Sequence, residues 1–292
     1  MRALILSGGG PLAVAWEAGV IAGLAESGIE LGEADFILGT SAGGIVGVQL
    51  AAGRPPADIA AAIVNETVGI APSGATTFAA DAIAKLPEMF ALSRSRPDDP
   101  AAARAEVGDL ALAAPADSEL NSVARFAAQT RVDAWPERPF GCVAVDAVDG
   151  SVRVLTRDCG ASPAHAVAAS CSLPGLVPPI TIGGRRYIDG GFASTANVDL
   201  LPDYERLLVL AFRPPGPAGD AMESHYVAQA AAVRHGGADV LFILPNDESQ
   251  SAIGTQTMEM QRRPEVVRAA MAQGRAEAER IEAFWQPGGL PG

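Results

Sequence analysis

Short apolar runs alternate with segments of helical periodicity in the first and last thirds of the chain. Apolar runs bounded by glycine or polar residues predict buried strands, and apolar residues spaced three or four apart predict helices. The predicted strands cover residues 2–6, 35–38, 206–212 and 240–244, and the predicted helices cover residues 12–25, 42–52, 221–234 and 264–284. Strands that alternate with helices favour a mostly parallel sheet with helices on both faces.

Two hairpins are predicted in the middle of the chain. Asp149-Gly150 and Gly183-Gly184 each separate two short β-prone runs, and such dipeptides are typical of tight turns between antiparallel strands. The runs that they join are 140–145 with 152–156 and 180–182 with 186–189, and a short helix at 164–169 is predicted between the two hairpins.

Residues 57–132 keep a helical pattern, but proline and glycine interrupt it, for example at Pro72, Gly74 and Pro87. We expect an inserted helical region here that covers a binding site. The chain as a whole, residues 1–292, is expected to form one α/β domain. The predicted architecture is a three-layer α/β/α sandwich with a mostly parallel central sheet and the helical insertion.

The formal net charge of −13 makes the chain unsuited to binding nucleic acid, or to binding anionic lipid by charge alone. No window reaches the roughly 18 uncharged apolar residues that a membrane-spanning helix requires. We therefore expect a cytoplasmic protein, for which any membrane or micelle contact is hydrophobic, peripheral and transient. Lys85 is the only lysine among abundant alanine and arginine, a bias typical of GC-rich bacterial genomes.

Cysteine and histidine are too few, and too scattered, for a metal site. The cysteines have no C-x-x-C spacing, which argues against both a disulfide framework and a zinc site. The residues concerned are Cys142, Cys159, Cys171, His165, His225 and His235. We expect no metal and no organic cofactor.

The stretch 39–43, Gly-Thr-Ser-Ala-Gly, has the pattern G-x-S-x-G. On its own this pattern also occurs in tight turns without a chemical role. Here a predicted strand precedes it and a predicted helix follows it, as a nucleophile elbow requires. In such an elbow the turn exposes the serine hydroxyl, and the positive end of the helix faces developing negative charge. Ser41 is therefore the candidate nucleophile, and Gly39 and Gly43 are the glycines of its motif.

Gly8, Gly9 and Gly10 lie between the first predicted strand and the first predicted helix. They could serve chain geometry alone, or they could form a dinucleotide-binding loop, because the segment reads G-x-G-x-x-A. A dinucleotide loop needs an acidic residue at the end of the second strand, whereas Glu33 and Asp35 lie at its other end. Glycine N–H groups beside a helix N-terminus can also turn toward one oxygen, which favours an oxyanion hole.

Asp189-Gly190-Gly191 is by itself typical of a hairpin turn, but an acyl-transfer serine needs a base. The usual α/β-hydrolase order places several strands before the nucleophile, then the acid and then the histidine. Ser41 follows only two predicted strands. His225 and His235 come after Asp189, so a triad with one of them stays an alternative.

Taken together and in this order, G-G-G-P-L-A, G-T-S-A-G and D-G-G resemble the motifs of the patatin-like phospholipase family. The segment from Ala168 to Gly191 also resembles the family's Ala-Ser-x-x-x-Pro segment, which leads into Asp-Gly-Gly. The resemblance extends from Arg2 to about Asn197. It implies the following site: Ser41 as nucleophile, Asp189 as its partner in a Ser-Asp dyad, Gly190 and Gly191 beside it, and the N–H groups of Gly8, Gly9 and Gly10 around the oxyanion.

The resemblance implies a serine acyl hydrolase that acts on lipid or fatty-acyl esters, of the phospholipase A, lysophospholipase or esterase type, without a cofactor. Two departures concern its preference for phospholipid. Pro11-Leu12-Ala13 stands where the family usually has Arg or Lys followed by Gly, and Asn197-Val198-Asp199 stands where it commonly has Asn-x-Pro. The alternative from another class is a non-catalytic nucleotide-binding or regulatory α/β protein that uses the glycine-rich loop.

Overall fold

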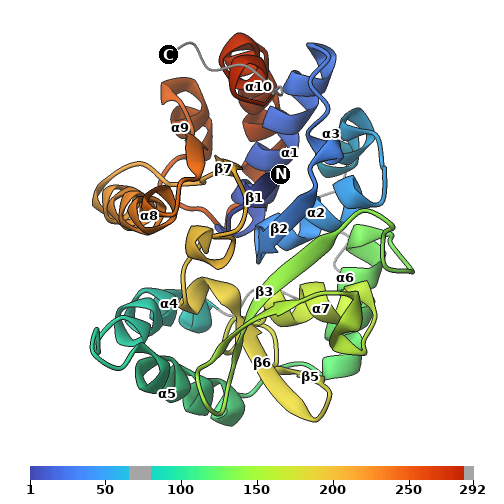
Figure 1. Ribbon diagram of the computed structural model, residues 1–292. Helices are drawn as coiled ribbons and strands as arrows, with labels where there is room; N and C mark the ends of the chain where they lie inside the picture. The colour runs from blue at the N-terminus through green and yellow to red at the C-terminus, as the bar shows by residue number, and fades with distance from the viewer. Residues whose placement is uncertain (66–79, 286–292) are drawn as a thin grey trace.

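Strand β1 lies near the centre of an eight-stranded mixed sheet, formed within the residues that the computed structural model describes, 1–65 and 80–285 (Figure 1). The strand order is β5-β6-β3-β2-β1-β7-β8, and β4 pairs with β3 outside this path. The strands are β1 (Arg2–Leu6), β2 (Phe36–Thr40), β3 (Phe140–Asp146), β4 (Val152–Leu155), β5 (Ile180–Ile182), β6 (Arg185–Asp189), β7 (Arg206–Leu210) and β8 (Asp239–Ile243).

The centre of the sheet is parallel and one side of it is antiparallel. β1 pairs in parallel with β2 and β7, β2 with β3, and β7 with β8. The pairs β3–β4, β3–β6 and β5–β6 are antiparallel. The predicted mostly parallel sheet and both predicted hairpins are confirmed. Because parallel strands end at the same edge of the sheet, the loops after β1 and β2 come together there.

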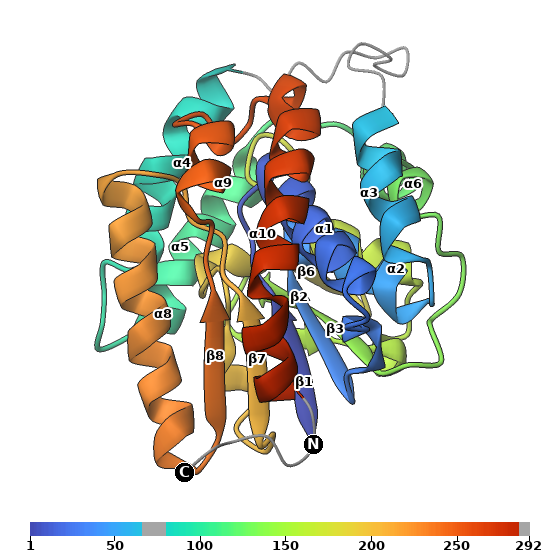
Figure 2. The same cartoon turned by 90° about the horizontal axis from the view of Figure 1, so that it is seen from above.

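Helices cover both faces of this sheet (Figures 1 and 2). One hydrophobic cluster joins one face to α1, α2, α3, α6, α7 and α10, and two others join the opposite face to α8 and α5, which confirms the three-layer arrangement. The helices are α1 (Pro11–Glu26), α2 (Ala42–Ala51), α3 (Pro56–Asn65), α4 (Ala80–Ser93), α5 (Pro100–Ala113), α6 (Glu119–Thr130), α7 (Pro163–Ser170), α8 (Pro217–His235), α9 (Asp247–Ile253) and α10 (Arg263–Trp285).

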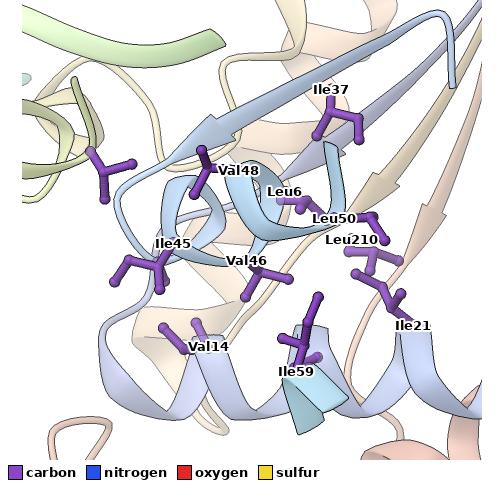
Figure 3. Close-up of a cluster of buried hydrophobic side chains, with 14 of the residues drawn as sticks. Leu6, Val14, Ile21, Ile37, Ile45, Val46, Val48, Leu50, Ile59 and Leu210 are labelled. Atoms are coloured by element: carbon purple, nitrogen blue, oxygen red, sulfur yellow. The ribbon is translucent and has the colours of Figure 1, made fainter. Parts of the chain in front are cut away.

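Both faces of β1 are buried, which explains its uninterrupted apolar sequence. Leu4 and Leu6 belong to the cluster under α1 and α2, whereas Ala3 and Ile5 belong to the cluster under α8. Figure 3 shows part of the first cluster, with Leu6 and Val46 of α2 among its members. The interior strand and the covering helices together hold the loop after β1 beside the loop after β2.

Strand β2 ends later than the pattern predicts. The sequence places a turn from Gly39, whereas β2 continues through Thr40, so that Ser41 is the first residue outside it. Gly39 pairs with Leu6 on one side and with Cys142 on the other. Pairing on both edges outweighs the local tendency of glycine to interrupt a strand.

Two further elements differ from the expectation. Helix α9 has no counterpart in the predicted elements, although Asn246 accepts a hydrogen bond from the N–H of Ser249 as an N-cap residue. Pro87, expected to break the helical insertion, lies inside α4 instead. Within the insertion predicted at 57–132, residues 66–79 lie outside the described residues, Pro72 and Gly74 among them.

Glu17 of α1 is an acidic side chain inside the core. Glu17 is 0% exposed, and neither of its carboxylate oxygens has a hydrogen-bond partner among the described residues. Burial raises the pKa of Glu17 well above its ordinary value, an effect that the nearby N–H of Ser7 only partly offsets. The folded protein therefore holds this proton more tightly than the unfolded chain does.

Replacing Glu17 with glutamine is expected to raise the free energy of unfolding at neutral pH by on the order of 1–3 kcal/mol, because glutamine enters the core without the proton uptake that Glu17 requires there. The stability that protonated Glu17 contributes is complete below the unfolded pKa, about 4.3, and declines as the pH rises toward the raised folded pKa. Urea unfolding at several pH values tests this, with the exposed Glu30→Gln as the matched control. Equal pH dependence in Glu17→Gln and wild type would contradict it.

Candidate active site

Ser41 occupies a sharp turn between β2 and α2. Its backbone has φ 51° and ψ −112°, and it is one of few described residues other than glycine with positive φ. A side chain in this region is strained, and such strain occurs where a turn must present one side chain in a fixed direction. The structure thus forms the strand-turn-helix elbow that the sequence predicts around Ser41.

The two glycines of the motif are required by close packing. A Cβ atom on Gly39 would lie 2.5 Å from the N atom of Gly44, and one on Gly43 would lie 2.1 Å from the carbonyl oxygen of Leu6. The N–H of Gly43 also donates to the carbonyl of Ser7 at 3.1 Å. These contacts hold the start of α2 directly against the end of β1.

Asp189 meets Ser41 at the end of β6. The Ser41 hydroxyl donates a hydrogen bond to Asp189 Oδ2 at 2.7 Å, although the two residues are 148 positions apart. The N–H of Gly191 donates to Oδ1 of the same carboxylate, also at 2.7 Å. A Cβ atom on Gly190 would lie 2.3 Å from the carbonyl oxygen of Val143, so the turn can lie against β3 only without a side chain there.

Burial changes the acidity of Asp189. The residue is 2% exposed, and this burial raises the pKa of Asp189 to about 7. The hydrogen bonds from Gly191 and Ser41 stabilise the carboxylate and oppose part of this rise. A carboxylate with a pKa near neutrality accepts a proton much more readily than an ordinary aspartate, so this environment suits a general base.

The glycine loop lies next to the elbow, but its three N–H groups differ. A Cβ atom on Gly8 would lie 3.3 Å from Cβ of Ser41. The N–H of Gly8 donates to the carbonyl of Thr195 at 2.7 Å. The sequence analysis assigns this N–H to the oxyanion, but in the structure it is already engaged by Thr195. The N–H groups of Gly9 and Gly10 have no hydrogen-bond partner among the described residues. The candidate oxyanion donors are therefore Gly9 and Gly10, just before the N-terminus of α1.

Ser170 at the end of α7 holds the elbow in place. The sequence analysis does not identify Ser170 as a functional residue. The N–H of Ser41 donates to Ser170 Oγ at 2.8 Å, and Ser170 Oγ donates to the carbonyl of Val143 at 2.6 Å. The available signal is the Ala-Ser-x-x-x-Pro segment, in which Ser170 is the serine.

Asn197 links the elbow to the loop after Asp189. Its side-chain amide donates to Thr40 Oγ1 at 3.0 Å and to the carbonyl of Gly190 at 3.4 Å. The backbone of Asn197 is left-handed, with φ 53°, which asparagine tolerates better than most residues. Val198 and Asp199, which follow it, depart from the Asn-x-Pro pattern. Asn197 itself bridges the Gly-Thr-Ser-Ala-Gly motif and the Asp-Gly-Gly motif.

None of the three histidines hydrogen-bonds to Ser41 or Asp189. His165 Nδ1 pairs with Ser162, His235 Nδ1 pairs with the carbonyl of Ala231, and His225 Nε2 is buried without a partner. The geometry therefore does not form the Ser-Asp-His alternative.

The dinucleotide alternative fits the structure poorly. The carboxylate of Asp35 accepts a hydrogen bond from the N–H of Arg2 at the opposite end of the strands from the glycine loop. Phe212 and Met258 pack against the loop: a Cβ atom on Gly9 would lie 2.3 Å from the Phe212 ring. An acidic group for a ribose is thus missing at the strand end where it would be needed.

Neither a metal cluster nor a membrane span occurs in the part of the chain that the structure describes. Within residues 1–65 and 80–285, no three His, Cys, Asp or Glu side chains come together as ligands for a metal ion. No helix in the same residues combines the length and the apolar character needed to cross a bilayer.

Two solved structures are similar to the chain over most of its length. VipD from Legionella pneumophila is 14% identical with a TM-score of 0.47, over 96% of this chain and 67% of that one. The type III effector protein ExoU is 16% identical with a TM-score of 0.39, over 96% of this chain and 53% of that one. Comparison with curated protein sequences gives no significant match.

A sequence model of one family covers the residues that form the site. The family described as patatin-like phospholipase matches residues 4–202, which include the glycine loop, Ser41 and Asp189. This match spans well over half of the chain. The chain therefore belongs to the patatin-like phospholipase family and is a serine hydrolase that acts on lipid esters.

Proposed function

We propose that the protein hydrolyses acyl esters of lipids through a covalent intermediate on Ser41, with Asp189 as the general base. The observation that carries this proposal is the 2.7 Å hydrogen bond from the Ser41 hydroxyl to Asp189 Oδ2. Ser41 Oγ attacks the ester carbonyl while its proton passes to Asp189, and the proton then goes to the leaving alcohol. Water then attacks the acyl-enzyme while its proton passes to Asp189, and Asp189 returns the proton to Ser41 Oγ as the carboxylic acid leaves.

The negative charge of the tetrahedral intermediate needs donors that are already in place. The N–H groups of Gly9 and Gly10 and the N-terminal end of α2 supply them in this proposal. Gly8 acts differently: its N–H holds the loop to Thr195 and its missing side chain leaves room beside Ser41.

Covalent labelling tests the proposal directly. A fluorophosphonate probe forms a stable adduct only with an activated serine, and we expect the adduct on Ser41. Peptide mass spectrometry identifies the modified residue. Absence of labelling in a folded protein would favour the non-catalytic alternative.

The dependence of kcat/KM on pH is expected to follow the ionisation of Asp189. Below pH 7 the carboxyl carries a proton and cannot accept another from Ser41, so kcat/KM should fall about tenfold per pH unit. Above pH 8 it should reach a plateau. Initial rates on an uncharged p-nitrophenyl ester measure this, and a profile that is flat between pH 5 and 8 would exclude Asp189 as the base.

Chelation is expected to leave the rate unchanged, because the proposed steps use only protein groups. Activity on the same ester is compared before and after dialysis against EDTA, with calcium added back as the control. Loss of activity that calcium restores would contradict the dyad chemistry.

A further inference from the structure

Two residues from distant segments, Thr195 and Phe212, hold the glycine loop that begins at Gly8. The carbonyl of Thr195 accepts the Gly8 N–H at 2.7 Å. The N–H of Phe212 donates to Oγ of Ser7, the residue before Gly8, at 2.8 Å. A Cβ atom on Gly9 would lie 2.3 Å from the ring of Phe212, so this ring packs directly against the loop. The position of the loop therefore depends on where Thr195 and Phe212 are held.

The hydroxyl of Tyr226 joins these two residues. Tyr226 lies on α8 and is 1% exposed. Its hydroxyl donates to the carbonyl of Phe212 at 2.8 Å and also lies 2.8 Å from Thr195 Oγ1. Because a carbonyl can only accept, the single phenol proton is directed to Phe212, and Thr195 is the donor in the second hydrogen bond. One buried oxygen thus fixes both residues that hold the glycine loop.

The surroundings of Tyr226 keep this oxygen in one place and in one protonation state. The Tyr226 ring stacks with the ring of Phe242 on β8, with centroids 6.3 Å apart, inside the hydrophobic cluster between α8 and the sheet. Figure 2 shows α8 alongside β8. Burial raises the pKa of Tyr226, so the phenol stays neutral over the pH range in which Asp189 gains and loses its proton. Both hydrogen bonds of the hydroxyl are therefore available throughout this range.

The glycine loop is fixed at two ends, and Tyr226 supports one of them. At the far end, the carbonyl of Gly10 accepts the N–H groups of Ala13 and Val14 in the first turn of α1. At the near end, the loop is held through the contacts that Tyr226 supports. Donors stabilise an oxyanion well only if they are in place before its charge develops. A shift at the near end would therefore weaken the oxyanion hole without removing a donor from it.

We propose that Tyr226 is a positioning residue of the reaction, which holds the glycine loop with the N–H groups of Gly9 and Gly10 toward the oxyanion. It acts through Thr195 and Phe212, and it touches neither the substrate nor the reacting atoms. This inference rests on the proposed function, in which the loop stabilises the tetrahedral intermediate. Tyr226 lies beyond the residues that the family model matches, so this support comes from a part of the chain outside the match.

Tyr226→Phe tests the proposal, because it removes the hydroxyl and keeps the ring. On the neutral p-nitrophenyl ester, kcat is expected to fall about tenfold or more while KM stays within about twofold, since the loss falls on the transition state. The inhibition constant of a trifluoromethyl ketone should rise by the same factor as kcat falls. In that complex Ser41 Oγ adds to the ketone carbon, the serine proton passes to Asp189, and the ketone oxygen becomes an oxyanion. The inflection of kcat/KM near pH 7 should remain, because Asp189 keeps its contacts.

Variants of Thr195 change the same hydrogen bond from its other end. Thr195→Val removes the bond and should weaken kcat and ketone binding by a smaller factor, because Tyr226 still holds Phe212. Thr195→Ser keeps the hydroxyl and should stay close to wild type. The effects of Thr195→Val and Tyr226→Phe should be less than additive, because the two substitutions remove one shared bond.

Thr130→Val is the matched control. It also removes a buried hydroxyl, which donates to the carbonyl of Phe126 at 2.9 Å within α6, so it should cost similar stability but keep the wild-type kcat and inhibition constant. If kcat and the inhibition constant of folded Tyr226→Phe stay within about twofold of wild type, the inference is overturned and the proposed hydrolysis stands. Should Tyr226→Phe not fold, the same comparison is made with Thr195→Val. A rise in KM alone, or an equal loss in Thr130→Val, would also overturn the inference. Failure of the proposed function shows separately, as wild-type protein without the fluorophosphonate adduct on Ser41.

Discussion

Ser41→Ala is expected to lower kcat for p-nitrophenyl ester hydrolysis by at least about 10⁴-fold while the protein stays folded. Without the hydroxyl no acyl-enzyme forms, and only the oxyanion donors and substrate binding still act on the background reaction. The substitution keeps the Cβ atom, so the backbone strain at φ 51° is the same in both proteins. Steady-state rates, burst amplitude and the fluorophosphonate adduct give three separate readings.

The control for this variant is Ser251→Ala on α9, whose hydroxyl donates to the carbonyl of Asp247 at an exposed position. It should retain the full rate and the adduct. Equal melting temperatures of wild type and Ser41→Ala establish that the loss lies in chemistry. Turnover by Ser41→Ala close to that of wild type, in the same preparation, would rule out Ser41 as the nucleophile.

The sequence predicts the elbow well because its causes are local. A strand, a short turn and a helix follow one another within a few residues, and Gly39 packs against Gly43 and Gly44 of the same segment. The end of β2 is predicted less well, because Gly39 is held there by β1 and β3 together. The apolar pattern of one strand does not show which other strands will pair with it, so it cannot predict how far that pairing extends the strand.

The base and the supporting contacts depend on segments far apart in sequence. Asp189 could be connected to Ser41 from the sequence only through the resemblance of the motifs, since 148 positions separate the two. The hydrogen bond from the N–H of Ser41 to Ser170 spans 129 positions, and nothing in either motif indicates that these two residues meet. The N–H of Gly8 is directed to Thr195 by the loop after β6, which corrects the prediction for that glycine.

Asp189→Asn is expected to lower kcat on the same ester by at least about 10²-fold, because positioned general-base catalysis contributes roughly 10²- to 10⁴-fold. Asparagine keeps the shape of the side chain and can still accept the hydrogen bond from Gly191, but it cannot take the proton of Ser41. Burial already raises the pKa of Asp189 to about 7, so a neutral side chain is easily accommodated and the variant should fold. It should also lose the inflection near pH 7 in kcat/KM.

The histidines decide between a dyad and a triad. His165→Ala, His225→Ala and His235→Ala should each lower the rate no more than about tenfold on a neutral short ester, about 1.4 kcal/mol, since none of the three hydrogen-bonds to Asp189. His165 is the one for which an indirect loss is expected, because α7 leads to Ser170 and hence to the elbow. In a triad one histidine would instead cost as much as the serine, because members of a catalytic unit act together. If His225→Ala or His235→Ala matches Ser41→Ala in a folded protein, Asp189 orients an imidazole and is not itself the base.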